Sequence, residues 1–225
     1  MQIPLWKKWL SYLRPITLEE TGSEQNLELA VVLDRGRLQL LAGNAIYSWD
    51  DLYRNFRVAF EQLDLAGRKL DDVLLLGLGL ASVPYILEKK HGKTCHYLAV
   101  EADEEIARLA LEYSLPRLKS YVEVVTADAE MYVEICEEQF DMVVMDIFED
   151  DLTPPQFETR EFLENCAARV RPGGLLLFNR LHHTLADRTA TERFYKNTFQ
   201  TVFPAAEKID TGGNWILSVV VSDER

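Results

Sequence analysis

Short apolar runs alternate with amphipathic segments along most of the chain, and this pattern predicts alternating strands and helices. From residue 72 onward, the predicted strands are 72–77, 95–100, 121–125, 140–145 and 174–179, and the predicted helices between and after them are 81–90, 103–113, 128–138, 155–170 and 185–200. Strands that are apolar at consecutive positions, such as residues 73–76, are typical of a sheet covered on both faces. We therefore expect an α/β fold with a doubly wound, mostly parallel sheet.

Two strands follow each other directly at the end of this pattern, at about 202–209 and 214–221. The turn between them, Thr211-Gly212-Gly213, predicts a C-terminal antiparallel hairpin. A seven-stranded, mostly parallel, Rossmann-like sheet that ends in this way resembles the class I methyltransferase fold.

The residues before 49 show a different pattern and predict a small extension. Residues 27–41 read as a β-hairpin around Asp34-Arg35-Gly36, and residues 49–65 read as an amphipathic helix with two aspartates at its start. Trp6 and Trp9 lie on one face of a short helix that Pro15 ends. The predicted division is therefore an N-terminal helix and hairpin over 1–48 and a Rossmann-like methyltransferase domain over 49–225.

Composition narrows the partners that we expect. The 225 residues carry a net charge of −13, which disfavours binding to nucleic acid. The three cysteines lack metal-ligand spacing, which favours a reducing cytoplasmic location and no metal site. No apolar run approaches the roughly 20 residues that span a bilayer, so no membrane partner is expected. The apolar face of Trp6 and Trp9 is compatible with a homodimer.

A glycine turn and a distant carboxylate predict a nucleoside cofactor. Gly77 and Gly79 directly follow a buried strand, and Glu101 ends the next strand about 20 residues later, where Rossmann-type sites hold ribose hydroxyls. Ser82 stands where a dinucleotide fingerprint has its third glycine. This disfavours a nicotinamide-dependent oxidoreductase and favours a cofactor without phosphates, such as S-adenosylmethionine.

Two more carboxylates end neighbouring strands. Asp128 can accept a hydrogen bond from an adenine amino group or cap the helix that follows. Asp146 directly follows the apolar strand 140–145. A charged side chain beside a buried strand is costly, so we expect it to have a function. Its position faces the reactive end of a cofactor laid across the sheet edge. An acidic loop follows it: Glu149, Asp150 and Asp151.

The run FDMVVMDIFEDDLTPPQFETREFLENCAARVRPGGLLLFNRL (140–181) resembles the spermidine synthase family of the S-adenosylmethionine-dependent methyltransferase superfamily. In that family a strand ends in an aspartate, and an acidic loop, a proline, a helix and a glycine turn follow. The segment LQLLAGNAIYSWDDLYRNFRVAFEQL is also similar, and the resemblance covers about 27–221. It implies that Asp146 is the catalytic carboxylate, and that the cofactor contacts Gly77, Gly79, Glu101, Asp128 and Asp146.

The resemblance also suggests which residues contact the substrate, and it shows where this chain departs from the family. Tyr47, Glu149 and Gln156 are the candidates for substrate binding. The family has an acidic residue, which grips the amino group of the aminopropyl donor, where this chain has Leu80. Ile147 and Phe148 replace small or polar residues after the catalytic aspartate.

These departures leave two functions open. The first is a polyamine-type transferase that uses S-adenosylmethionine or its decarboxylated form on a small-molecule acceptor, such as an amine. Leu80 slightly favours methyl transfer over aminopropyl transfer. The alternative is a non-catalytic nucleoside-binding or scaffold protein that retains the fold, and it predicts that Leu80, Ile147 and Phe148 fill the cofactor cleft.

Overall fold

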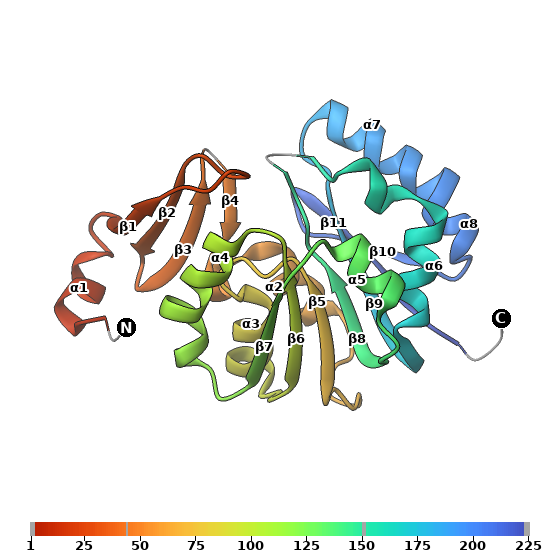
Figure 1. The fold of residues 1–225 in the computed structure, drawn as a ribbon, viewed down its shortest axis with the longest axis horizontal. Helices are drawn as coiled ribbons and strands as arrows, with labels where there is room; N and C mark the ends of the chain where they lie inside the picture. The colour runs from red at the N-terminus through yellow and green to blue at the C-terminus, as the bar shows by residue number, and fades with distance from the viewer. Residues whose placement is uncertain (1–2, 44, 150–151, 223–225) are drawn as a thin grey trace.

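The computed structural model describes residues 3–43, 45–149 and 152–222, and two β-sheets organise them (Figure 1). The larger sheet has seven strands in the order β10-β11-β9-β8-β5-β6-β7. These strands are β5 (Asp72–Leu76), β6 (His96–Glu101), β7 (Tyr121–Thr126), β8 (Phe140–Met145), β9 (Val170–Leu181), β10 (Glu207–Asp210) and β11 (Asn214–Val220). β5 to β9 pair in parallel, whereas β11 pairs antiparallel with both β9 and β10. The predicted sheet and its C-terminal hairpin are confirmed, but the first strand of the hairpin begins at Glu207 and not at the predicted residue 202, which ends a helix.

Helices cover both faces of this sheet because its strands alternate their side chains between two cores. Val73 and Leu75 belong to one core, and Leu74 and Leu76 belong to the other. The first core includes residues of α2 (Arg54–Gln62), α3 (Ser82–His91) and α4 (Glu104–Leu109). The second core includes residues of α5 (Ala129–Ile135), α6 (Arg160–Ala168) and α7 (Leu185–Phe194). The short helix α8 (Gln200–Val202) follows in the chain. Apolar contacts on both faces therefore fix the strands whose carboxyl ends form one edge.

The N-terminal extension is a four-stranded antiparallel sheet, where the sequence predicts only a hairpin. Its strands lie in chain order: β1 (Ile16–Thr21), β2 (Leu29–Asp34), β3 (Arg37–Ala42) and β4 (Ala45–Ser48). The predicted hairpin is the central pair, with its turn at Arg35 and Gly36. Leu29, Val31 and Leu40 join the first core, so this sheet packs on the side of α2, α3 and α4.

The predicted helix 49–65 is shorter and its first residues have another role. α2 begins at Arg54, after a 3₁₀ turn over Asp50–Leu52. Asp50 is fully buried and accepts hydrogen bonds from both terminal nitrogens of Arg117, at 3.0 and 2.7 Å. Asp51 pairs with Lys90 at 2.8 Å and with Arg37. The two aspartates therefore join the two sheets through ion pairs and do not serve the dipole of an exposed helix end.

The first helix, α1 (Leu5–Leu10), lies at the outer end of the N-terminal sheet (Figure 1). Ser11, just after it, accepts the backbone N–H of Arg35 at 3.1 Å and that of Gly36 at 2.9 Å. Trp6 and Trp9 are 63% and 76% exposed, so they do not pack onto this chain, and the homodimer stays a prediction. None of the described helices has the length and apolarity to cross a membrane.

Candidate active site

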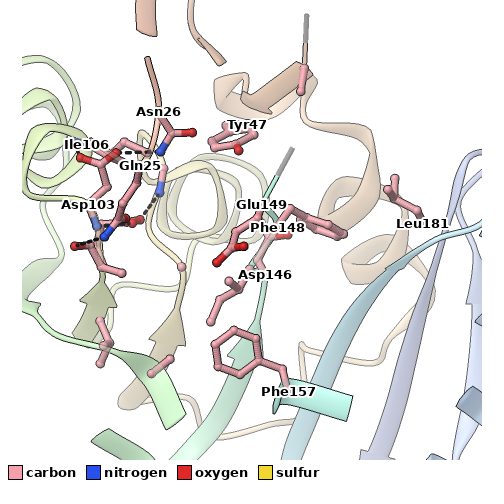
Figure 2. A pocket seen from close by; sticks show the side chains of 18 of the residues that line it. Gln25, Asn26, Tyr47, Asp103, Ile106, Asp146, Phe148, Glu149, Phe157 and Leu181 are labelled. Atoms are coloured by element: carbon pink, nitrogen blue, oxygen red, sulfur yellow. Dashed lines mark hydrogen bonds between the residues drawn. The ribbon is translucent and has the colours of Figure 1, made fainter. Parts of the chain in front are cut away.

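A cleft of about 890 Å³ lies along the carboxyl ends of β5, β6, β7 and β8. The N-terminal sheet supplies its other wall through Gln25, Asn26 and Tyr47, as Figure 2 shows. The structure brings together along this cleft all the residues that the sequence proposes for the site: Gly77, Gly79, Glu101, Asp128, Asp146, Tyr47, Glu149 and Gln156. The other members of the predicted acidic loop, Asp150 and Asp151, lie outside the described residues.

Glycine is required in the turn after β5 for steric reasons. Gly77 has φ +87°, and a Cβ atom there would lie 2.4 Å from the carbonyl oxygen of Asp146. Gly79 has φ +52°, and its Cβ would lie 3.2 Å from Cβ of Ser48. Both angles lie in the left-handed region that glycine adopts at little cost. The turn is therefore compressed between the end of β8 and the end of β4.

Glu101 braces this turn from the end of β6. Its Oε2 accepts the N–H of Leu78 at 2.9 Å and that of Gly79 at 3.3 Å, and its Oε1 accepts the N–H of Asp103 at 3.2 Å. Burial raises the pKa of Glu101, and these backbone N–H donors oppose the rise. An ionised carboxylate has about four acceptor sites, so Glu101 can also accept from a ribose hydroxyl in the cleft.

Two aspartates combine helix capping with a place in the cleft wall. Asp128 is the N-cap of α5 and accepts the N–H of Met131 at 3.0 Å, so the capping role holds and the contact with adenine stays a prediction. Asp103 is the N-cap of α4, and it also accepts from Ser23 at 2.5 Å and from Nδ2 of Asn26 at 2.7 Å. These side-chain bonds attach the β1–β2 loop to the cleft (Figure 2).

Asp146 stands at the carboxyl end of β8, and two side chains donate to it. The hydroxyl of Tyr53 lies 3.2 Å from its Oδ1, and Nδ2 of Asn179 lies 2.8 Å from the same oxygen. Burial raises the pKa of Asp146 to about 7; Asn179 and Tyr53 lower it, and the charge of Glu101 adds to the rise. A carboxyl group with a pKa near neutrality is suited to accept a proton at physiological pH.

Sequence reasoning missed Tyr53 and Asn179, as well as Asn214, whose Nδ2 donates to Oδ1 of Asn179 at 2.9 Å. Tyr53 gives no distinct signal in the sequence, because other aromatic residues stand near it in and around α2. Asn179 had a readable signal, because it is a polar residue in the run LLLFN and is fully buried. A buried carboxamide needs hydrogen-bond partners, and a strand's carboxyl end is where they serve a site.

The cleft is open despite the departures from the family pattern. Leu80 is fully buried in the first core and is absent from the cleft lining. Its backbone N–H donates to Oγ of Ser48 at 2.8 Å. Ile147 and Phe148 form part of the wall and leave the volume free. The three side chains therefore do not fill the cleft as the non-catalytic alternative predicts.

The described cleft lining is acidic. It includes Glu101, Asp103, Asp128, Asp146 and Glu149, and among the described residues it includes no lysine or arginine. His183, which follows β9, is the one basic side chain in this part of the lining. A site of this charge attracts cations and repels carboxylates.

The sequence of the chain was compared with protein families and with known proteins. No protein-family model matches the chain. A polyamine aminopropyltransferase of Vibrio vulnificus is 26% identical over 158 residues, which are 68% of this chain and 52% of that protein. The chain therefore spans about half the length of this relative.

Solved structures share the fold. Spermidine synthase from Thermotoga maritima matches with a TM-score of 0.66 and 14% identity over 91% of this chain and 72% of that one. Human methyltransferase-like protein 13 in complex with SAH matches with a TM-score of 0.56 and 21% identity over 72% of this chain and 76% of that one. With the strand order and the additional N-terminal sheet, these matches show that the chain has the spermidine synthase-like class I methyltransferase fold.

Proposed function

We propose that this protein transfers an alkyl group from a sulfonium nucleoside to a small-molecule amine, and that the donor is decarboxylated S-adenosylmethionine. Under this proposal the transferred group is aminopropyl. The aminopropyltransferase relative and the fold are compatible with this chemistry. The cleft volume of about 890 Å³ lies within the roughly 300–1,000 Å³ of small-molecule sites.

We infer the decarboxylated donor from the negative charge of the cleft. S-adenosylmethionine has a carboxylate, and in the described lining that group would meet five carboxylates against one histidine and no lysine or arginine. The decarboxylated donor lacks that group and keeps its positive charges, as does an alkylammonium acceptor. Both substrates of aminopropyl transfer are therefore cations, which the negative electrostatic potential of the site attracts.

This proposal replaces the slight preference for methyl transfer that the sequence gives. That preference depends on Leu80 standing where the family places a carboxylate in the cleft. Leu80 is buried in the core, so its side chain takes no donor volume. The carboxylate of Glu149, in the wall of the same cleft, remains as a partner for the donor's amino group.

Asp146 would hold the proton that the reaction releases. An alkylammonium has no lone pair, so it must lose a proton before its nitrogen attacks. Asp146 can accept this proton from its place beside Tyr53 and Asn179, since its pKa of about 7 leaves a large ionised fraction at neutral pH. As the C–N bond forms, the C–S bond breaks and its electron pair returns to sulfur. Glu101 and the glycine turn would hold the nucleoside so that the two reactants are aligned.

Calorimetry and mass spectrometry test the proposal. We expect the decarboxylated donor to bind at least about tenfold more tightly than S-adenosylmethionine, which is about 1.4 kcal/mol of binding free energy. With a panel of mono-, di- and triamines, products should gain one aminopropyl group. Asp146→Asn should retain donor binding and slow transfer by about 10²–10⁴-fold.

The other outcomes are informative. A product that gains one methyl group, together with tighter binding of S-adenosylmethionine, would assign methyl transfer. Donor binding without a product from any amine would favour the non-catalytic alternative. If neither donor produces heat or a thermal shift, the nucleoside site itself is wrong.

A further inference from the structure

A chain of buried carboxamides leads from the C-terminal hairpin to Asp146. Asn214, the first residue of β11, donates through Nδ2 to Oδ1 of Asn179 at 2.9 Å, and Asn179 donates through Nδ2 to Oδ1 of Asp146 at 2.8 Å. Asn179 is fully buried and Asn214 is 8% exposed. β9 and β11 are paired so that Asn214 lies opposite Leu181, diagonally across from Asn179 on the same face.

With Asn214 oriented as observed, the two bonds together allow one orientation of the Asn179 side chain. If this carboxamide were turned over, its oxygen would face Oδ1 of Asp146 and its NH₂ would face the NH₂ of Asn214. Both contacts would place like partial charges together at hydrogen-bond distance. Asn214 therefore supports the rotamer that the carboxylate needs. Both donors to Asp146 engage Oδ1, so in the described part of the chain Oδ2 is the oxygen that remains for a substrate.

We propose that Asn214 is a positioning residue: it acts through Asn179 and holds the Asn179 amide so that Nδ2 donates to Asp146 Oδ1 and Oδ2 faces the acceptor amine. This role rests on the proposed function, in which Asp146 accepts the proton. It also gives the antiparallel strand β11 a part in the site, because β11 lies two strands away from β8 in the sheet and reaches Asp146 through Asn179 of β9.

Other titratable groups also act on Asp146. Tyr53 donates to it from the residue before α2, and the charge of Glu101 reaches it from the end of β6. The same cleft also holds Asp103, Asp128, Glu149 and His183. A neutral substitution at Asn214 leaves all these charges in place. A change in the titration of Asp146 in such a variant therefore comes from the lost carboxamide and not from a lost charge.

The test measures the pKa of Asp146 directly, by ¹³C NMR titration of protein labelled at the aspartate carboxyl carbons, with Asp146→Asn used to assign the signal. In Asn179→Leu the pKa should rise by about one to two units, since a hydrogen bond to the charged form is lost. In Asn214→Leu it should rise in the same direction by about half a unit or more. Asn26→Leu, the same substitution at another cleft asparagine, should leave it within about 0.2 units.

Activity and folding readouts separate the possible failures. The acidic limb of the pH profile for transfer should move upward in Asn214→Leu by the shift that NMR reports, while the affinity for the donor stays unchanged. If Asn214→Leu does not fold, Asn214→Ala takes its place. An Asp146 pKa equal to that of the native protein in a folded Asn214 variant would overturn the positioning role. The titration needs no substrate, so it decides this role even if no donor binds and the proposed function fails.

Discussion

The backbone at Gly77 packs against the backbone of Asp146, so closely that a Cβ atom at Gly77 would lie 2.4 Å from the Asp146 carbonyl oxygen. The N–H of Asp146 in turn donates to the carbonyl of Leu76 at 2.8 Å. These two contacts, where β5 and β8 end, therefore place the turn proposed to hold the nucleoside next to the carboxylate proposed to take the proton.

Gly77→Ala should disrupt both parts of the site. The left-handed φ at Gly77 costs an alanine about 1–2 kcal/mol, and the overlap with the Asp146 carbonyl adds to it. We expect a total loss of about 3–5 kcal/mol of unfolding free energy, measured by urea denaturation, and loss of detectable donor binding.

Gly92→Ala is the matched control for this prediction. Gly92 ends α3 with φ +65°, and a Cβ atom there would meet nothing within 4 Å. It should cost only the conformational strain, about 1–2 kcal/mol, with donor binding retained. Equal effects of the two substitutions would show that the contact with Asp146 does not matter.

The parallel strands and the residues at their ends could be predicted from local sequence. The apolar runs of β5 and β8 indicate burial on both faces, and parallel strands place their carboxyl ends at one edge. Glu101 and Asp146 therefore fall in one cleft on topology alone. The strand β1 was missed because four of the six residues in its sequence, ITLEET, are polar, a pattern that resembles a loop.

The hydrogen-bond partners of Asp146 could not be predicted in the same way. Tyr53 lies 93 positions away in the sequence and Asn179 lies 33 positions away. Their contacts depend on the register of β8 against β9 and on the packing of the segment before α2, which local periodicity does not encode. The burial of Leu80 similarly depends on how the turn is compressed against Ser48.

Asp146 should destabilise the folded protein at alkaline pH. Its folded pKa of about 7 lies above the value of about 4 for an unfolded aspartate, so its stabilising contribution is complete below pH 4 and is lost as the pH rises through 7. Asp146→Asn removes this dependence. We expect the variant to exceed the native protein in unfolding free energy at pH 8.5 by up to about 4 kcal/mol, and the difference to shrink between pH 7 and pH 4.

Glu149→Gln provides the comparison, because Glu149 is an exposed carboxylate of the same cleft. It should change the unfolding free energy by less than about 0.5 kcal/mol at either pH. Urea denaturation at several pH values measures both variants. A constant difference between Asp146→Asn and the native protein from pH 4 to pH 8.5 would contradict the raised pKa.

Leu80→Asp restores the residue type of the spermidine synthase family, yet it should damage this protein. Leu80 is fully buried in the first core, which is apolar. The new carboxylate would therefore lose its water without gaining an ion-pair partner. We expect a loss of about 2–5 kcal/mol in urea denaturation and no gain in donor affinity by calorimetry. Leu80→Met, which nearly conserves volume, should cost less than about 1.5 kcal/mol. A stable Leu80→Asp variant with tighter donor binding would place this side chain in the cleft.

Arg117→Met should weaken the junction between the two sheets. Asp50 is fully buried and paired with Arg117, and its pKa is raised by burial while Arg117 lowers it. Removing Arg117 leaves a buried charge without its partner, which costs about 3–5 kcal/mol of unfolding free energy. The folded pKa of Asp50 then rises further, so the loss should be largest at neutral and alkaline pH and should shrink as acid protonates the carboxyl group.

Arg160→Met is the control for this prediction, because it breaks the exposed pair between Arg160 and Glu164. It should cost less than about 1 kcal/mol of unfolding free energy in the same urea measurements. Comparable losses for the two variants would mean that the buried pair between Asp50 and Arg117 contributes little to stability.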